Sequence, residues 1–368
     1  MKIPDKILAE FNNFISLIDE NDNVAILHHT DMDGISSGVL VKKGINKFNI
    51  TPKLIVPQSK RSITKELLEQ LKEKNITKII AVDIPLEQYP GMDKIKELNI
   101  EVLVIDHHPL TVEQENNIIV IKSSMLETER DPSTICAANL VYQLFNSITD
   151  FEEVDWIAAL GMVGDSTYNY EKEFVDKVLK KLNIEFKEDI FDTELGRAVS
   201  YVTYAECSMK ENVQEKLFDA VCNSKNQIEI IEKLEEFEPV EKEMERLVNE
   251  YSEKAKEVTK DLMLYNVETE YLLNSPVSTI ISFKKEKNKT IIVTQEWEEN
   301  INISARRQDK KLHVGNLLKD CVAEIPKSSG GGHKPAGGAS VPKSFYHNFE
   351  IELIKKHKHI TDNNYIQE

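Results

Sequence analysis

Three apolar segments of this chain each lead into acidic side chains, and this feature constrains its fold more than any other. The segments are residues 24–27, 79–82 and 102–105, and none of them contains a charged residue. Such runs are typical of strands that are buried on both faces, as in a parallel sheet. The motifs that follow them are Asp31-Met32-Asp33, Asp83 and Asp106-His107-His108. Because parallel strands end at one edge of a sheet, we expect these motifs to lie close together.

Strand and helix signals alternate through the N-terminal part of the sequence. Strands are expected at 24–29, 53–57, 78–83, 102–106 and 118–122, and helices near 34–45, 62–74, 86–98 and 134–147. This alternation is typical of βαβ units and predicts an α/β fold with a doubly wound, mainly parallel sheet. Right-handed crossovers then place the carboxyl ends of the strands at the same edge.

The pattern changes after residue 150. A helical pattern over 151–222 is interrupted near Gly164-Asp165, and a charged helical pattern follows over 226–260. Strand patterns return at 262–266, 277–283, 290–295 and 301–305, followed by a helix near 313–323 and a glycine-rich segment at 330–338. We therefore expect a first domain over 1–222, a helical linker over 223–261, a smaller α/β domain over 262–345 and a polar tail over 346–368.

The chain is acidic, with 46 Lys and Arg against 63 Asp and Glu, which gives a net charge of −17. Such a protein does not attract polyanions over its whole surface, so a nucleic acid would have to be held locally, by metal ions and a few basic side chains. The four cysteines are scattered without a C-x-x-C pair, which is typical of reduced thiols in a cytoplasmic protein. No apolar run approaches transmembrane length, so we expect no membrane partner.

The acidic motifs and the histidines have the composition of a metal site. Side chains alternate along an extended segment, so His29, Asp31 and Asp33 can face one pocket. Asp83 could bridge two metal ions, and Asp165 is a fifth carboxylate at the break of an apolar helix. Burying such carboxylates is costly unless a cation neutralises them. Carboxylate and imidazole ligands together suit Mn²⁺, with Mg²⁺ or Co²⁺ as substitutes.

Each motif taken alone has another interpretation. An Asp-x-Asp-Gly sequence occurs in turns and in Ca²⁺ loops, and a lone aspartate such as Asp83 can cap a helix. The order and spacing of all four motifs favour a site with two metal ions, which would clamp the attacking and leaving oxygens of a phosphoryl displacement. The sequence therefore indicates a metal-dependent enzyme.

The same motifs carry a family resemblance. Asp31-x-Asp33, Asp83, Asp106-His107-His108 and Asp165 resemble motifs I to IV of the DHH phosphoesterases. The segment Gly330-Gly331-Gly332-His333 resembles the signature of the domain that accompanies DHH in the RecJ-like and nanoRNase-like branch. The resemblance covers roughly residues 20–345. It implies the fold described above, in which the first domain is a DHH domain.

The resemblance also implies roles for individual residues. The ligands of two Mn²⁺ ions would be His29, Asp31, Asp33, Asp83, His107 and Asp165. Among the catalytic residues, His108 would face the scissile phosphate, and Asp106 would orient a histidine. In several family members the first ligand lies four residues before the first aspartate, where this chain has Leu27. His29, two residues before it, resembles the archaeal RecJ-like pattern.

The second domain is expected to bind the substrate. Ser304-Ala305-Arg306-Arg307 resembles the family's Ser-x-Arg strand, whose arginine grips a substrate phosphate. Strand alternation sends the two arginines to opposite faces, so we assign this role to Arg306 and expect Arg307 to be a solvent-exposed charge. Backbone amides of a glycine-rich segment can cradle a phosphate. The expected substrate-binding residues are Arg306, Gly330, Gly331, Gly332, His333 and Lys334.

The function implied by the resemblance is a single-strand-specific exonuclease that releases mononucleotides from DNA, RNA or both. One alternative is a phosphodiesterase or phosphatase for nanoRNA, cyclic dinucleotides or adenosine bisphosphate. Another is a scaffold in a replication or repair assembly. The glycine signature argues against a manganese pyrophosphatase-like enzyme. The expected partners are single-stranded nucleic acid or short oligonucleotides, and a replication or repair protein and a homodimer remain open.

Overall fold

The computed structural model describes residues 2–109 and 118–364 of the chain. The chain divides into two compact units. The first unit comprises Met1–Glu206 and Lys210–Glu236, and the second comprises Cys207–Met209 and Phe237–Glu368. Each unit has its own sheet and its own apolar core.

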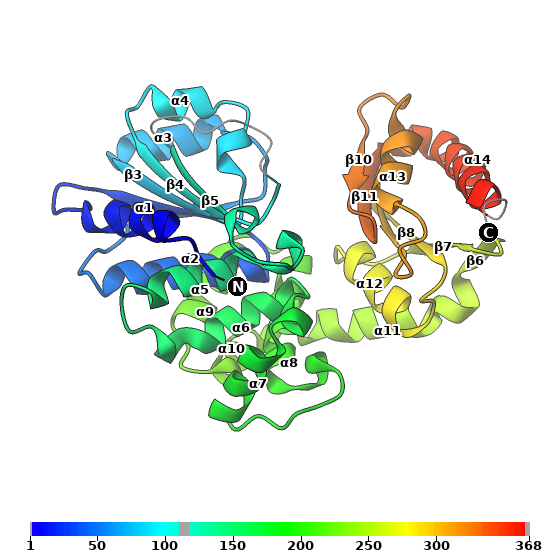
Figure 1. Ribbon diagram of the computed structural model, residues 1–368. Coiled ribbons are helices and arrows are strands. Elements are labelled where there is room, and N and C mark those ends of the chain that lie inside the picture. Colours follow the sequence, from blue (N-terminus) through cyan, green and yellow to red (C-terminus); the bar gives the residue numbers. More distant parts are fainter. Residues whose placement is uncertain (1, 110–117, 365–368) are drawn as a thin grey trace. The chain divides into compact units, whose positions relative to one another are not determined.

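The first unit is built on a five-stranded, fully parallel sheet (Figure 1). Its strands are β1 (Val24–His29), β2 (Leu54–Gln58), β3 (Lys78–Val82), β4 (Glu101–Asp106) and β5 (Ile118–Lys122). They lie in the order β2-β1-β3-β4-β5. The chain therefore forms β2 on one side of β1 and then crosses back to form β3 on the other side of β1. The predicted doubly wound parallel sheet is therefore confirmed. The neighbouring strands β1 and β3 mark its topological switch point, where open sheets of this kind bind ligands.

Helices cover both faces of this sheet (Figure 1). On one face, α3 (Lys65–Glu73), η1 (Leu86–Gln88) and α4 (Met92–Lys96) bury leucine, methionine and isoleucine side chains against β1, β3, β4 and β5. On the other face lie α2 (Met32–Asn46) and α5 (Ala137–Asn146). Both α2 and α5 pack in turn on α6 (Asp155–Gly164).

The remaining described α-helices of this unit range from 7 to 14 residues. They are α1 (Asp5–Ser16), α7 (Lys172–Lys181), α8 (Glu194–Cys207), α9 (Val213–Cys222) and α10 (Gln227–Lys233). Single 3₁₀ turns occur at η2 (Ser123–Met125), η3 (Pro132–Thr134), η4 (Glu152–Val154), η5 (Tyr168–Tyr170) and η6 (Ile190–Asp192). The predicted break near Gly164-Asp165 is the C-terminal end of α6.

The second unit contains a six-stranded mixed sheet in the order β10-β11-β9-β8-β7-β6. Its strands are β6 (Lys256–Thr259), β7 (Leu262–Val267), β8 (Thr290–Trp297), β9 (Asn300–Arg306), β10 (Ser329–Gly332) and β11 (Ala336–Pro342). Only β7 and β8 pair in parallel among these described strands. The smaller α/β domain expected from the sequence is thus present.

Helices also cover this second sheet. They are α11 (Glu238–Lys254), α12 (Asn274–Lys284), α13 (Val314–Val322) and α14 (Tyr346–Asn364), with 3₁₀ turns at η7 (Glu235–Phe237) and η8 (Lys343–Phe345). Along β9, Ile301, Ile303 and Ala305 join the apolar core formed with α13 and α14. The alternate residue Ser304 points to the opposite face, where its hydroxyl meets Ser278 of α12.

One expected strand is wrong. Residues 277–283 form most of α12, although valine, threonine and isoleucine are frequent there. The helix begins at Asn274, and Pro276 lies in its first turn, where a missing backbone donor costs no helical hydrogen bond. The helix also covers one face of the sheet, because α12 packs on β8 and β9. Tertiary packing therefore overrides the local β propensity.

The ends of the second unit also differ from the expectation. The residues expected as a linker divide between the units: α10 belongs to the first, whereas α11 and β6 belong to the second. The expected polar tail forms α14 up to Asn364, and residues 365–368 lie outside the described part. Phe349 and Leu353 are spaced four residues apart, so one face of the helix is apolar and is buried.

Among the residues that the structure describes, no helix combines the length and the apolar character needed to cross a lipid bilayer.

Candidate metal centre

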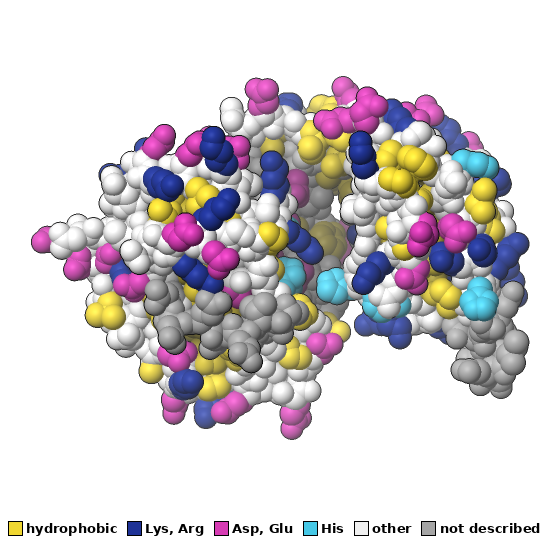
Figure 2. All heavy atoms as spheres, turned by 90° about the horizontal axis from the view of Figure 1, so that it is seen from above, with side chains coloured by type: hydrophobic (Ala, Val, Ile, Leu, Met, Phe, Trp, Pro, Cys, Tyr) yellow, Lys and Arg dark blue, Asp and Glu magenta, His cyan; other side chains and the backbone are white. Residues whose placement is uncertain are grey.

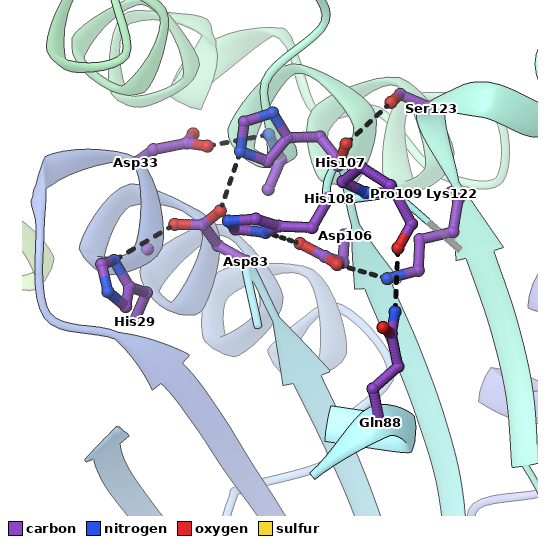
Figure 3. Close-up of polar contacts among 12 residues, drawn as sticks. His29, Asp33, Asp83, Gln88, Asp106, His107, His108, Pro109, Lys122 and Ser123 are labelled. Atoms are coloured by element: carbon purple, nitrogen blue, oxygen red, sulfur yellow. Dashed lines mark hydrogen bonds and ion pairs between the residues drawn. The ribbon is translucent and has the colours of Figure 1, made fainter. Parts of the chain in front are cut away.

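The predicted metal-binding side chains lie at the carboxyl edge of the parallel sheet. His29 is the last residue of β1, Asp83 directly follows β3, and Asp106 is the last residue of β4. His107 and His108 continue from Asp106 toward the same edge (Figure 3). His29 and Asp83 thus lie at the switch point between β1 and β3, where an open α/β sheet is expected to bind ligands.

Three groups of ligand-type side chains meet here, and in each group the ligand atoms all lie within 4.8 Å of one another. The groups are His29, Asp31 and Asp83; Asp83, His107 and His108; and Asp33, His107 and Asp165. Asp83 and His107 each belong to two groups, so the three form one continuous cluster, called here the metal cluster. The structure brings together all six residues expected as ligands, and it adds His108.

Local backbone geometry positions the first part of the metal cluster. Asp31 caps α2, and its carboxylate accepts a hydrogen bond of 3.0 Å from the Gly34 amide. Gly34 has to be glycine because a Cβ would lie 2.5 Å from the His29 carbonyl oxygen. Asp83 has a φ angle of 57°. This left-handed conformation costs about 1–3 kcal/mol in a residue other than glycine and is common at functional sites.

Asp33 is held differently from the expectation. It lies in the first turn of α2 rather than in an extended segment, because Asp31 already caps the helix and Met32 begins it. Its two carboxylate oxygens accept hydrogen bonds of 2.8 Å from the amides of Ala137 and Ala138. These amides belong to the N-terminus of α5, where unpaired N–H groups favour an anion. The first turn of α5 therefore fixes the Asp33 carboxylate.

Burial and mutual repulsion perturb the carboxylates of the metal cluster. Burial raises the pKa of Asp83 well above its ordinary value, and the charges of Asp33 and Asp31 raise it further. Burial and then the charge of Asp33 raise the pKa of Asp165 to about 7. Burial would also raise the pKa of Asp31, but the hydrogen bond and the charge of His29 lower it to about 2. Proteins commonly neutralise buried negative charge of this kind with a cation.

His107 lies between two of these carboxylates. Burial would lower its pKa, but Asp83 and then Asp165 raise the pKa to about 10. His107 Nε2 lies 3.3 Å from Asp83 Oδ1, and His107 Nδ1 lies 3.9 Å from Asp165 Oδ2. Within the described residues, the buried atoms Asp83 Oδ1 and His107 Nδ1 have no hydrogen-bond partner. Buried oxygen and nitrogen atoms without a hydrogen-bond partner fit a divalent cation with carboxylate and imidazole ligands.

Two residues that no motif marked support Asp106 and His108: Lys122 binds Asp106 directly, and Glu87 pairs with Lys122. Asp106 is buried, its Oδ1 accepts a hydrogen bond of 2.7 Å from His108 Nδ1, and its Oδ2 accepts one from buried Lys122. Lys122 also pairs with Glu87 over 2.9 Å. Burial opposes ionisation, but the hydrogen bond and charge of His108, together with Lys122, hold the pKa of Asp106 well below its usual range. The available signal is the lysine that ends the apolar run 118–121.

Glu206 of α8 is another carboxylate that the sequence analysis did not single out. Its Oε1 accepts a hydrogen bond of 3.5 Å from Thr30, which is 176 residues away in the sequence. Burial and then the charge of Asp31 raise the pKa of Glu206 to about 7. No local pattern marks this residue, because only the folded chain brings the end of α8 to the segment that follows β1.

In the second unit, Arg306 is anchored by hydroxyl groups. Its guanidinium donates hydrogen bonds of 3.1 Å to Thr279 and Ser275 of α12, and to Ser304 on its own strand. It also donates one of 3.0 Å to the Ala305 carbonyl. No carboxylate in the described part of the chain pairs with Arg306, and burial lowers its pKa to about 10. A guanidinium in this setting is suited to an anionic ligand.

The glycine-rich segment forms an antiparallel pair of strands, β10 and β11. Gly331 is opposite Gly338, which in turn is opposite Ser304 on β9. Opposed residues share a face of the sheet, so Gly331 and Gly338 lie on the face that carries Arg306. These two glycines are called here the open glycine surface. A Cβ on Gly331 would meet nothing within 4 Å, so the fold does not require a glycine there.

The other residues expected to bind substrate also shape this pair of strands. A Cβ on Gly330 would lie 2.9 Å from Val322, and Gly332 has a φ angle of 135°. His333 and Lys334 form the connecting turn, with exposed side chains. Their carbonyl oxygens accept hydrogen bonds of 3.2 and 3.1 Å from the first amides of α13, so the turn also caps that helix.

Arg307 is not the solvent-exposed charge that was expected. Its side chain is buried, pairs with Asp309 over 2.8 and 3.1 Å, and donates a hydrogen bond of 3.2 Å to Thr290. Thr290 also contacts His357 of α14 over 3.0 Å. Strand alternation does not apply to Arg307 because β9 ends one residue before it.

Two family models match the chain. Residues 23–164 match the DHH family, N-terminal domain, and residues 273–359 match the DHHA1 domain. The first range includes the metal cluster up to His108, with Asp165 one residue beyond its end. The second includes Arg306 and the glycine-rich strands. No curated protein matches the sequence significantly.

Several solved structures share this fold. RecJ from Thermus thermophilus in complex with Mn²⁺ has a TM-score of 0.71 and 12% identity, over 95% of this chain and 54% of that one. This chain therefore spans about half of that RecJ chain. The DHH domain of a protein described as belonging to a family of ribosomal proteins has a TM-score of 0.72 and 15% identity, over 96% and 90%. PggH, a pGpG-specific phosphodiesterase from Vibrio cholerae, has a TM-score of 0.52 and 17% identity, over 91% and 98%. At these identities the likeness establishes the fold alone.

Proposed function

We propose that this chain, which belongs to the DHH family and carries a DHHA1 domain, is a metal-dependent phosphoesterase. The proposed reaction is hydrolysis of the terminal phosphodiester bond of single-stranded DNA or RNA, with release of a mononucleotide. The observation that carries the proposal is the metal cluster at the carboxyl edge of the parallel sheet. Such a set of carboxylates and imidazoles is well suited to phosphoryl transfer chemistry.

The metal cluster would hold two divalent ions. The residues that we assign as ligands are His29, Asp31, Asp33, Asp83, His107 and Asp165. RecJ structures that share this fold contain Mn²⁺ or Mg²⁺, and we propose Mn²⁺ here, with Mg²⁺ or Co²⁺ as substitutes. When bound, such ions activate water and stabilise the charge that develops on the phosphoryl oxygens.

His108 is the residue that we place against the scissile phosphate. Its Nδ1 contacts the Asp106 carboxylate, which can only accept, so Nδ1 carries the proton. The ring then lies between Asp106 and Asp83, and Nε2 is turned toward the metal cluster (Figure 3). In this position His108 can contact a phosphoryl oxygen, while Asp106 orients the ring.

Arg306 and the open glycine surface are proposed to bind the terminal nucleotide. Arg306 presents a guanidinium that is held by hydroxyls and carries no carboxylate partner among the described residues. The glycine surface at Gly331 and Gly338 leaves the backbone accessible for close approach of a ligand. The exposed side chains of His333 and Lys334 would add donors and charge at the adjoining turn.

The surface charge favours capture of strand ends over binding along a long strand. On the face shown in Figure 2, Lys and Arg side chains are interspersed with Asp and Glu, and no broad basic track is visible. With a net charge of −17, attraction of a polyanion has to be local. This distribution supports a substrate that is gripped at a terminal phosphate.

A second candidate is a phosphodiesterase for very short substrates such as nanoRNA or dinucleotides. The fold of this chain is similar to that of the pGpG-specific phosphodiesterase PggH over 98% of that protein. The acidic surface is also compatible with small substrates. The scaffold alternative is less favoured, because the ligand-type side chains are all present and cluster together.

The deciding experiment is a product analysis with purified protein and Mn²⁺. Single strands of DNA and RNA, labelled at either end and ranging from two nucleotides to long oligonucleotides, would be digested and their products separated. Stepwise shortening of long strands supports the exonuclease. Turnover of only the shortest strands supports the second candidate. Equal hydrolysis by an Asp83→Asn variant would trace the activity to a contaminant, and no hydrolysis by the wild type would refute both proposals.

A further inference from the structure

A buried lysine lies directly behind the proposed catalytic histidine. Lys122 ends β5, and the strand register places it opposite Asp106 on β4. Opposed residues on neighbouring strands point to the same face, so register alone brings the ammonium group to the Asp106 carboxylate. Glu87 of η1 lies 2.9 Å from the same ammonium group. Figure 3 shows Lys122 on the side of Asp106 opposite His108.

The residues around Lys122 also hold the backbone of segment 106–109. The hydroxyl of Ser123, which follows Lys122, contacts the carbonyl oxygen of His107 over 3.5 Å. From η1, Gln88 donates a hydrogen bond of 2.9 Å to the carbonyl oxygen of Pro109. The end of β5 and the turn after β3 thus support this segment from both sides (Figure 3).

Stability alone is a weak reason to bury this lysine. Taking an ion pair out of water costs about as much as the pair regains, and an apolar replacement is often no less stable. What Lys122 provides is orientation. One oxygen of Asp106 is bonded to His108 and the other to Lys122, so the carboxylate cannot rotate without breaking a charge-assisted hydrogen bond.

We propose that Lys122 is a positioning residue for His108 and that it acts through Asp106. By fixing the Asp106 carboxylate, Lys122 keeps His108 Nδ1 turned toward Asp106 and Nε2 turned toward the metal cluster. Glu87 forms a second ion pair with the same ammonium group. This inference rests on the proposed function, because it assigns Lys122 a part in the same reaction.

The chain offers a matched control for this inference. Lys78 is also a buried lysine of the parallel sheet, paired with Glu101 over 2.9 Å and with Asp22 over 3.9 Å. It begins β3, whereas Lys122 ends β5, so it lies at the opposite edge of the sheet from the metal cluster. The variant Lys78→Met therefore removes a buried lysine without disturbing the proposed catalytic groups.

The test compares wild type with Lys122→Met, Lys78→Met, Asp106→Asn and the double variant of Lys122 and Asp106. Steady-state kinetics on a single-stranded oligonucleotide would be combined with calorimetric titration of Mn²⁺. We expect Lys122→Met to lower kcat by about 10- to 100-fold, with KM and Mn²⁺ affinity changed by less than about twofold. Lys78→Met should keep the wild-type kcat, and Lys122→Arg should recover most of it. The double variant should lose no more than Asp106→Asn alone.

Three results would overturn the inference. They are a kcat for Lys122→Met equal to that of Lys78→Met, additive losses in the double variant, and a loss of Mn²⁺ affinity that accounts for the whole defect. If Lys122→Met does not fold, Lys122→Gln is measured against the same criteria.

If the wild type hydrolyses no oligonucleotide, the proposed function fails and the inference is decided by NMR. Long-range ¹H–¹⁵N spectra of the imidazoles report which ring nitrogen carries the proton. We expect His108 to carry its proton on Nδ1 in the wild type and on either nitrogen in Lys122→Met. Identical His108 signals in the two proteins would overturn the inference.

Discussion

Gly161 offers a sharp test of how the metal cluster is built, because α6 packs closely against both α5 and α2 at this residue. A Cβ at Gly161 would lie 2.4 Å from the Cβ of Ala138 and 2.9 Å from Asp33 Oδ1. The amide of Ala138 is one of the two that bind the Asp33 carboxylate. The substitution Gly161→Ala therefore presses on a proposed metal ligand and on its anchor at once.

The expected loss of stability follows from these distances. Carbon atoms prefer a separation of about 3.5–4.0 Å, so α6 has to retreat by roughly 1 Å. Overpacking of this kind costs about 1–3 kcal/mol, and the better helix propensity of alanine offsets about 1 kcal/mol. A net loss near 1 kcal/mol lowers the Tm of a unit of this size by roughly 2–4 °C. Displacement of Asp33 should also weaken Mn²⁺ binding about 10-fold.

The assay is calorimetric unfolding of the metal-free protein, followed by titration with Mn²⁺. The control is Gly331→Ala, since a Cβ there would meet nothing within 4 Å and should leave both quantities unchanged. Wild-type Tm and wild-type Mn²⁺ affinity in Gly161→Ala would refute the close packing described here. A lower Tm with unchanged Mn²⁺ affinity would refute only the link between α6 and the Asp33 carboxylate.

Three further predictions concern single side chains. The substitution Asp83→Asn keeps the size of the side chain and its tolerance of a left-handed backbone, and it should abolish Mn²⁺ binding in calorimetry. It should not lower the Tm of the metal-free protein, because burial and like charges already raise the pKa of Asp83. A Tm several degrees lower would contradict this prediction. Arg306→Lys should raise KM for oligonucleotides and leave Mn²⁺ affinity unchanged, since a lysine cannot reproduce the planar guanidinium; an unchanged KM would argue against a role in substrate binding. Burial lowers the pKa of His357 from 6.5 to about 4, so the unfolded chain binds this proton first and the second unit should lose stability as pH falls from about 6.5 toward 4. Urea unfolding should show a weaker pH dependence over that range in His357→Gln, and equal dependence in both proteins would contradict the prediction.

The sequence sufficed for the fold class and for the family. Parallel strands buried on both faces appear as uninterrupted apolar runs, so β1, β3 and β4 could be located within about a residue of their observed ends. The DHH and DHHA1 matches confirm the resemblance that the motifs carried. The roles of the individual residues at the metal cluster stay predictions, and the experiments above address them.

Two of the expectations that the structure overturns have separate physical causes. Residues 277–283 have a composition that favours a strand but form α12, which covers the face of the sheet that carries Ser304. Arg307 was expected in solvent but is buried against Asp309 and Thr290. For α12, packing on β8 and β9 outweighs the local β propensity. For Arg307, the alternation of side chains along β9 does not apply, because the strand ends one residue before it.

What the sequence by itself determined is the parallel sheet and the acidic and imidazole groups at its carboxyl edge, because both are local properties of consecutive residues. Only the tertiary structure decided what each group contacts. Asp33 binds an amide 105 residues away, Asp106 binds a lysine 16 residues away, and Arg306 binds a hydroxyl 27 residues away. These partners are set by helix packing, strand register and the path of the crossovers, and none of these is encoded in the spacing of a motif.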